Sequence, residues 1–137
     1  MLDSLSMDWK PLLEAALAVR RRAYCRYSGF AVGAAVLTDS GRIFSGCNVE
    51  NKTYGLTVCA ERVAVASAVA AGELRITAVA VATDTDPPAT PCGPCREVLS
   101  EFGTPDMPVL LANLEDESIE HRLGDLLPFP FELRTAD

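Results

Sequence analysis

The stretch Cys59-Ala-Glu-Arg-Val-Ala-Val-Ala-Ser-Ala-Val-Ala-Ala71, followed by Ile76-Thr-Ala-Val-Ala-Val-Ala-Thr83, decides the fold. Its first part is rich in alanine and apolar nearly all round, which predicts a buried helix that ends at Gly72. Its second part is a short apolar run with β-branched residues, typical of a strand covered on both faces. A buried helix that leads into a buried strand predicts a sheet with helices packed on its faces.

The flanking segments supply the other elements. Between Trp9 and Tyr24, apolar residues follow the spacing of a surface helix, for which Asp8 is the expected N-cap. We expect strands over 30–38 and 42–48 that form a hairpin, loops over 51–55 and 84–91, a helix over 93–102, a strand over 109–112 and an ordered, non-helical tail near 126–131. This order predicts an α/β fold, a three-layer α/β/α sandwich with a mixed central sheet.

Length and charge limit the classes of protein that fit. The 137 residues suit one domain over residues 1–137. Residues 1–62 carry eight Lys and Arg against six Asp and Glu, whereas residues 63–137 carry four against thirteen. This acidic half disfavours a nucleic-acid partner or an anionic membrane surface. The basic run Arg20-Arg21-Arg22 falls inside the first expected helix and indicates a solvated or intersubunit helix face.

The start of the chain and its cysteines point to a reducing compartment. Met1-Leu-Asp-Ser4 contains an acid and no apolar stretch, and no window approaches the ~18 apolar residues of a membrane span. We therefore expect a cytoplasmic protein without a membrane partner, in which the five cysteines are thiols or metal ligands. The single histidine, His121, excludes chemistry built on paired histidines.

Three of the cysteines are spaced to converge on one point. Cys92 and Cys95 open one expected helix and Cys59 opens another, so their sulfurs meet if the two helices flank neighbouring strands. Three sulfur ligands leave the fourth position of a tetrahedral zinc ion open for water, as in a catalytic site. The alternatives are a closed structural zinc site completed by Cys47 or Cys25, and a redox-active dithiol of the thioredoxin type.

Two charged residues beside Cys59 favour hydrolysis. Three thiolates give the zinc site a net negative charge, which the two helix N-termini and Arg62, donating to a sulfur, would offset. Glu61 lies in the same apolar helix, where burial raises the pKa of a carboxyl group and suits it to carry protons. A structural ion pair between Glu61 and Arg62 is the alternative.

The residues Cys59-Ala-Glu-Arg62 and Pro91-Cys-Gly-Pro-Cys-Arg96 resemble the zinc signature of cytidine deaminases. Other segments resemble the same family in the same order, namely Tyr27-Ser-Gly-Phe-Ala-Val-Gly-Ala-Ala35, Gly46-Cys-Asn-Val-Glu-Asn51, Tyr54-Gly55 and Leu126-Leu-Pro128. The resemblance implies one Zn²⁺ per chain on the three cysteines. It also implies hydrolytic deamination of cytidine and deoxycytidine to uridine and deoxyuridine, with release of ammonia, in pyrimidine salvage.

The resemblance also implies roles for single residues. Water adds to carbon 4 of the cytosine ring while Glu61 protonates the ring nitrogen and then passes a proton to the departing ammonia. Asn48 and Glu50 hold the ribose hydroxyls, the pyrimidine rests against Phe30, and the backbone N–H of Ala60 contacts the ring carbonyl. A deaminase of blasticidin or another nucleoside analogue is the alternative, which the Asn-Val-Glu-Asn segment disfavours.

Short family members with three cysteine ligands are homotetramers whose sites are completed across subunits, so the resemblance implies the same assembly here. Phe131 corresponds to the tail phenylalanine that reaches a neighbour's base pocket. Phe129 competes for that role, because Phe129-Pro130 replaces the small residues usual there. Glu97 stands where the family commonly has glutamine, and it adds a negative charge near the metal ligands.

Overall fold

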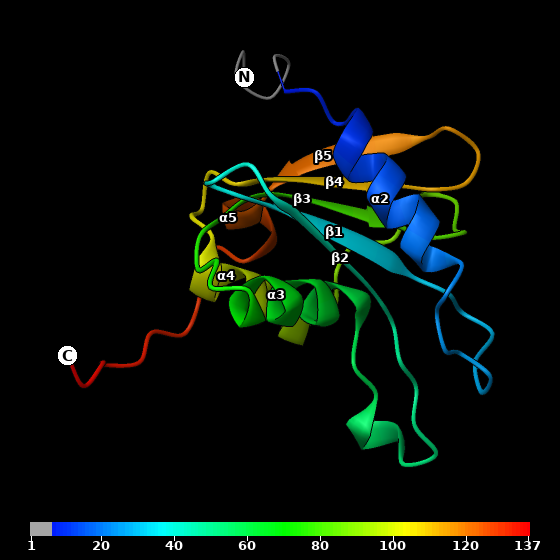
Figure 1. Ribbon diagram of the computed structural model, residues 1–137, viewed down its shortest axis with the longest axis horizontal. Coiled ribbons are helices and arrows are strands. Elements are labelled where there is room, and N and C mark those ends of the chain that lie inside the picture. Colours follow the sequence, from blue (N-terminus) through cyan, green and yellow to red (C-terminus); the bar gives the residue numbers. More distant parts are fainter. Residues whose placement is uncertain (1–6) are drawn as a thin grey trace.

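The computed structural model describes residues 7–137 and arranges them as a central sheet between two layers of helices (Figure 1). The helices are α2 (Lys10–Arg20), α3 (Ala60–Ala70), α4 (Gly93–Phe102), α5 (Leu123–Leu126) and the 3₁₀ turn η1 (Tyr54–Leu56). The strands are β1 (Gly33–Thr38), β2 (Ile43–Cys47), β3 (Ile76–Ala82), β4 (Pro108–Ala112) and β5 (Ser118–Arg122).

The sheet is mixed, as the sequence predicts. Its strands lie in the order β2-β1-β3-β4-β5, and only the pair β3–β4 is parallel. A parallel pair needs a crossover connection, and α4 supplies it here. Within that pair Val81 lies opposite Leu111, while Val36 of β1 lies opposite Val79 of β3. Gly33, at the start of β1, lies opposite Ala82, at the end of β3, so these two strand termini lie together at one end of the sheet.

The two faces of the sheet bury different side chains. Ala78, Ala80 and Ala82 of β3 pack with Leu12 and Ala16 of α2. The alternate residues Val79 and Val81 pack on the other face in the cluster that contains α3 and Leu99 of α4. Because successive strand residues point to opposite faces, one seven-residue strand contributes to both cores. The predicted three-layer α/β/α sandwich is confirmed.

Two glycines fix the placement of α3. A Cβ atom on Gly46 of β2 would lie 2.4 Å from the backbone nitrogen of Ala64, so glycine permits the close approach of α3 to the strand. At the other end, Gly72 has φ of +88° directly after the C-cap residue Ala71. The predicted stop at Gly72 is therefore confirmed.

The outer face of α3 differs from the prediction. The sequence predicts a helix buried all round, but Ala66, Ser67 and Ala70 are exposed, and Val69 retains 37% of its accessible surface. The reason is the layered architecture, since a helix on the outside of a three-layer sandwich turns only one face to the sheet. In this chain the other face is small and apolar rather than charged.

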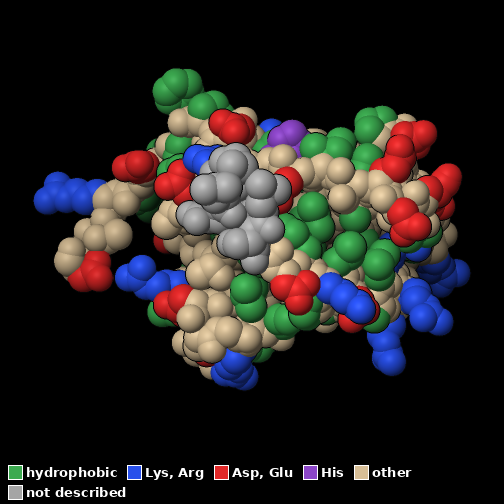
Figure 2. Space-filling view, turned by 90° about the horizontal axis from the view of Figure 1, so that it is seen from above, with side chains coloured by type: hydrophobic (Ala, Val, Ile, Leu, Met, Phe, Trp, Pro, Cys, Tyr) green, Lys and Arg blue, Asp and Glu red, His purple; other side chains and the backbone are tan. Residues whose placement is uncertain are grey.

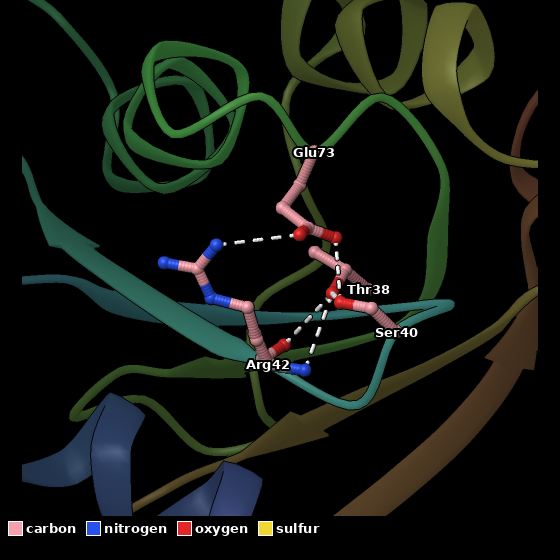
Figure 3. Close-up of polar contacts among 4 residues, drawn as sticks. All are labelled: Thr38, Ser40, Arg42 and Glu73. Carbon is pink, nitrogen blue, oxygen red and sulfur yellow. Dashed lines mark hydrogen bonds and ion pairs between the residues drawn. The ribbon is translucent and has the colours of Figure 1, made fainter.

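A polar cluster ties the β1–β2 turn to the segment after α3 (Figure 3). The hydroxyl of Ser40 donates to Oε1 of Glu73 at 2.7 Å, and Nη1 of Arg42 lies 3.3 Å from Oε2. Within the turn, the backbone N–H of Arg42 donates to Oγ1 of Thr38 at 3.2 Å. The hydroxyls of Ser40 and Thr38 hold the pKa of Glu73 below its usual range, with a smaller contribution from Arg42. The cluster fixes the end of α3 that lies far from its cysteine.

Several boundaries differ from those expected. The first helix ends at Arg20 rather than at Tyr24, because the backbone of Tyr24 pairs instead with Asn48 and Glu50. Its N-cap is Trp9 rather than Asp8, although Oδ1 of Asp8 accepts the backbone N–H of Lys10 at 3.1 Å. Neither β5 nor α5 is predicted from the sequence. The residues after α5 are non-helical, as predicted.

Surface charge is mixed on the α2 side of the molecule. Figure 2 looks down on this side, where basic and acidic side chains stand close together at one end.

In residues 7–137, no helix is both long and apolar enough to cross a bilayer. The expectation drawn from Met1–Ser4 lies outside the described residues.

Candidate metal centre and adjoining pocket

Two helix N-termini bring three cysteines together. Cys59 is the N-cap of α3, Cys92 is the N-cap of α4, and Cys95 lies in the first turn of α4. The Sγ atoms of Cys59 and Cys92 are 3.8 Å apart, those of Cys92 and Cys95 are 3.2 Å apart, and all three lie within 4.8 Å of one another. Sulfurs on a tetrahedral zinc ion with bonds of ~2.3 Å lie about 3.8 Å apart, so the cluster fits such an ion.

In the absence of a cation, the surroundings of the cluster favour protonated thiols. Burial raises the pKa of the Cys95 thiol, and the nearby Glu61 carboxylate and the other two sulfurs raise it further. Burial is also the main cause that raises the pKa of Cys59. Three thiolates at this separation repel one another unless a metal ion neutralises them. Among the described residues the cluster includes neither Cys25 nor Cys47, so the fourth position is not closed by a cysteine.

A short two-stranded ribbon joins the metal centre to a second polar group. Val49 and Val58 exchange both backbone hydrogen bonds, at 2.9 Å each, as an antiparallel pair. Figure 1 shows the segment between β2 and α3 projecting from the sheet, with η1 near its tip. Because side chains alternate along each strand, residues 48 and 50 share one face with residues 57 and 59. The pairing sets Asn48 opposite Cys59.

Glu50 is held in place by three donors. Its Oε1 accepts the backbone N–H groups of Tyr27 at 3.0 Å and Ser28 at 3.2 Å, and its Oε2 accepts the hydroxyl of Ser28. The Ser28 hydroxyl is the main cause that holds the pKa of Glu50 below its usual range. The side chain is buried and ionised, and one acceptor position remains free for a ligand.

Asn48 fixes the segment that carries Phe30. Its Nδ2 donates to the carbonyl of Phe30 at 2.8 Å, and its Oδ1 accepts the backbone N–H of Val32 at 2.9 Å. These two bonds use half of the amide's capacity, which leaves one N–H and one acceptor position. The Phe30 ring, 43% exposed, is thereby held at the edge of the site.

The side chains surround a cavity of about 260 Å³. Its lining contains most of the site residues that the sequence predicts, namely Phe30, Asn48, Glu50, Cys59, Ala60, Glu61 and Cys92. Cys95 is buried and is not part of this lining. The backbone N–H of Ala60 opens α3 and has no acceptor within the helix, so it can donate to a ligand.

Glu61 is the buried acid of the site. It lies in the first turn of α3, with only 5% of its surface accessible, and it lines the cavity beside Cys59. Burial raises the pKa of this carboxyl group. A carboxyl group with a raised pKa, beside a cavity, can accept and return a proton near neutral pH. Within residues 7–137, the ion pair considered between Glu61 and Arg62 does not form.

Six of the thirteen residues that line the cavity were not predicted from the sequence. The residues not anticipated are Val32, Thr57, Val81, Thr83, Ala89 and Thr90. The sequence shows that side chains alternate along residues 48–50. It does not show that this segment pairs with residues 57–59, and this pairing is what brings Thr57 to the pocket. Val81 and Thr83 reach the pocket because β3 ends there, where the carboxyl ends of strands commonly bind ligands.

The loop that leads into Cys92 is anchored at three points. Oγ1 of Thr83 accepts the backbone N–H of Ala89 at 3.3 Å, and Nδ2 of the buried Asn113 donates to the carbonyl of Thr85 at 3.0 Å. Arg96 donates from Nε to the carbonyl of Pro91 and from Nη1 to the carbonyl of Leu126, each at 2.7 Å. These bonds fix the backbone on the N-terminal side of the metal ligands.

Four other residues singled out from the sequence lie outside this cavity. Phe129 and Phe131 stand on the C-terminal segment, 91% and 73% exposed, away from the pocket of their own chain. Glu97 faces a different groove, which it shares with Phe131. Arg62 is partly buried in the first turn of α3, and the structure records no hydrogen bond from it to a sulfur of the described residues.

Comparisons with known proteins agree with this geometry. Residues 7–111 match the family model described as the cytidine and deoxycytidylate deaminase zinc-binding region. The chain is 45% identical to a cytidine deaminase from Sporosarcina psychrophila over 125 residues, which are 91% of this chain and 92% of that one. It superposes on the crystal structure of a cytidine deaminase from Burkholderia pseudomallei with a TM-score of 0.87 and 48% identity, covering 91% of this chain and all of that one.

A more distant relative bears on the alternative substrate. A blasticidin-S deaminase from Bacillus cereus is 34% identical over 108 residues, which are 73% of this chain and 76% of that one. Both its identity and its coverage are lower than those of the two proteins named above.

Proposed function

The chain belongs to the cytidine and deoxycytidylate deaminase family, and from this premise we propose that it hydrolyses cytidine and deoxycytidine to uridine and deoxyuridine, with release of ammonia. The observation that carries the proposal is the three-sulfur cluster with an open fourth position beside the buried carboxyl group of Glu61. Cys59, Cys92 and Cys95 would hold one zinc ion. When bound, zinc supplies a Lewis acid that lets water ionise near neutral pH.

The proton transfers fall to Glu61. Its carboxylate accepts a proton from the attacking water and delivers it to the ring nitrogen next to carbon 4. It then transfers the second proton of that water to the departing amino group, so that ammonia leaves and a carbonyl replaces the amine. The raised pKa of Glu61 favours both directions of transfer, because the acid and its conjugate base are then both accessible near neutral pH.

The other pocket residues orient the nucleoside. The free acceptor of Glu50 and the remaining amide groups of Asn48 are suited to sugar hydroxyls, since each supplies a fixed polar atom at the cavity wall. The Phe30 ring offers a flat apolar surface to the pyrimidine, and the N–H of Ala60 suits the ring carbonyl. The positive charge of Arg62, three residues after Cys59, would partly offset the negative charge of the three sulfurs.

We also propose that residues 1–137 form one catalytic domain that works as a homotetramer. Two features support this assembly: the exposed apolar outer face of α3, and the exposed Phe129 and Phe131 on the C-terminal segment. Either phenylalanine would complete a neighbouring pocket. We further propose a cytoplasmic location and a place in pyrimidine salvage.

A substrate panel tests this function. Purified protein is incubated separately with cytidine, deoxycytidine, cytosine and blasticidin S while ammonia release is followed, and zinc is measured in the same sample. We expect about one zinc per chain and turnover of the two nucleosides. Activity on cytosine alone would remove the role of Asn48 and Glu50, activity on blasticidin S alone would establish the other substrate class, and metal-free active protein would refute the zinc centre.

A further inference from the structure

The segment that carries Phe30 precedes the paired part of the sheet, and side chains supply most of its hydrogen bonds. Residues 30–32 lie just before the first residue of β1. Oγ of Ser28 accepts the backbone N–H of Phe30 at 2.9 Å, and the amide of Asn48 donates to the Phe30 carbonyl. The Phe30 ring lines the cavity but is 43% exposed, so packing holds it only in part. The bonds to the backbone of this segment therefore help to determine where the ring lies.

Arg20 supplies a further bond to this segment, from the other layer of helices. Its Nε donates to the carbonyl of Ala31, the residue next to Phe30, at 3.0 Å. Arg20 is the last residue of α2, which packs on the face of the sheet opposite to α3. A hydrogen bond from a charged donor is stronger than one from a neutral donor. One wall of the cavity is thus tied to a helix, residues 10–20, that does not itself line the cavity.

The stem of Arg20 lies close against the start of β1. A Cβ atom on Gly33 would lie 2.7 Å from Cβ of Arg20 and 2.0 Å from the carbonyl oxygen of Ala16, so glycine permits the end of α2 to meet the strand here. Arg20 is partly buried, whereas Arg21 and Arg22 are exposed. The basic run of the sequence therefore divides into one arginine that bonds to its own chain and two that remain at the surface.

We propose that Arg20 is a positioning residue for substrate binding, which holds Phe30 at the cavity through the carbonyl of Ala31. The inference rests on the proposed deamination of nucleosides at this site, where the ring of Phe30 receives the pyrimidine. Without the guanidinium group, the Ala31 carbonyl loses its charged partner and residues 30–32 gain conformational freedom. Freedom that is lost again when the nucleoside binds weakens binding. The chemical step at the metal centre should be unchanged, so the effect should fall on KM rather than on kcat.

The test is a double-mutant cycle between Arg20 and Phe30. Arg20→Met removes the donor and keeps much of the stem, and Arg21→Met is the matched control, since it removes the same charge from an exposed neighbour. Steady-state kcat and KM for cytidine are measured for both variants, for Phe30→Ala, and for Arg20→Met combined with Phe30→Ala. We expect Arg20→Met to raise KM about 3–10-fold, the effect of one hydrogen bond, with kcat within about twofold. In the Phe30→Ala background the same change should alter KM by less than about twofold.

Each outcome decides the inference. An unchanged KM in Arg20→Met, or an equal rise in Arg21→Met, would overturn it, because the bond to Ala31 would then have no effect of its own. A full rise in the Phe30→Ala background would overturn it too, since Arg20 would then act elsewhere. We expect unchanged zinc content and a melting temperature within about 5 °C of the wild type, and an Arg20→Met protein that fails to fold would show a role in stability instead and overturn the inference. Wild-type protein inactive on every nucleoside would refute the proposed function, whereas active wild-type protein with an unaffected variant refutes this inference alone.

Discussion

Replacing Arg96 with methionine tests how the fold holds the metal ligands in place. The guanidinium group joins the carbonyl of Pro91, next to Cys92, to the carbonyl of Leu126 at the end of α5, with two bonds of 2.7 Å. Methionine retains much of the apolar stem and removes both bonds. Hydrogen bonds from a charged donor contribute about 1.5–3 kcal/mol each. Because Arg96 is partly exposed, the lower value applies, and the variant should lose about 3 kcal/mol of unfolding free energy.

Thermal unfolding of the zinc-loaded protein, followed by circular dichroism, measures this loss. At about 4 °C per kcal/mol for a domain of this size, Tm should fall by about 12 °C. Arg122→Met is the matched control, since it removes an exposed ion pair of 3.4 Å with Asp106 and should cost under about 1 kcal/mol. The variant should also release zinc to a chelator faster than the wild type. A Tm within about 3 °C of the wild type would refute the stabilising role, and unchanged zinc release would refute the link to the metal ligands.

Three further perturbations follow from the site. Glu61→Gln should retain one zinc per chain, by metal analysis, and lose kcat by about 10²–10⁴-fold, the typical contribution of a general acid–base group; near-normal turnover would contradict its role. Ser28→Ala should raise the pKa of Glu50, because the Ser28 hydroxyl lowers it. Wild-type Glu50 stays ionised as pH falls until its lowered pKa is reached, and Ser28→Ala raises that pKa, so the acid-side rise of KM should begin at higher pH in the variant. KM–pH profiles that coincide would contradict this. Zinc at 1,000 times its Kd adds about 4 kcal/mol to the free energy of unfolding, so removal of the metal with a chelator should lower Tm. It should also make Cys92 accessible to a thiol reagent. An unchanged melting curve would argue against a metal in the fold.

The core of the fold and the metal ligands could be predicted because their signals are local. The run before Gly72 is long, rich in the strong helix former alanine and followed by a glycine, which favours a helix, and two cysteines at i and i+3 that open a helix lie on the same face. β5 was missed because Ser-Ile-Glu-His-Arg has one apolar side chain and lies at an edge of the sheet. Such a strand forms by pairing with β4, which the sequence does not display.

The pocket wall escaped prediction for a related reason. Nothing in the sequence distinguishes Thr57 from other threonines, because only the pairing of Val49 with Val58 in the fold sets it opposite Glu50. Likewise, Asn48 was expected only to bind substrate, whereas the structure uses half of its amide to hold the backbone around Phe30. Contacts between distant segments determine both roles, and such contacts leave no periodic signal in one sequence. The end of α2 at Arg20 has the same origin, since Tyr24 is taken up by pairing with residues 48–50.

The paired segments 48–50 and 57–59 have a consequence for how this protein can diverge. Two backbone hydrogen bonds at Val49 and Val58 set the spacing between Glu50 and the metal-cluster residue Cys59, so residues 51–56 beyond them do not enter that spacing. Insertions or exchanges at the tip can therefore accumulate while the reacting centre keeps its dimensions. A library randomised over 51–56 would vary what the projecting loop touches without retuning the chemistry, which makes this loop a natural position at which to graft new contacts.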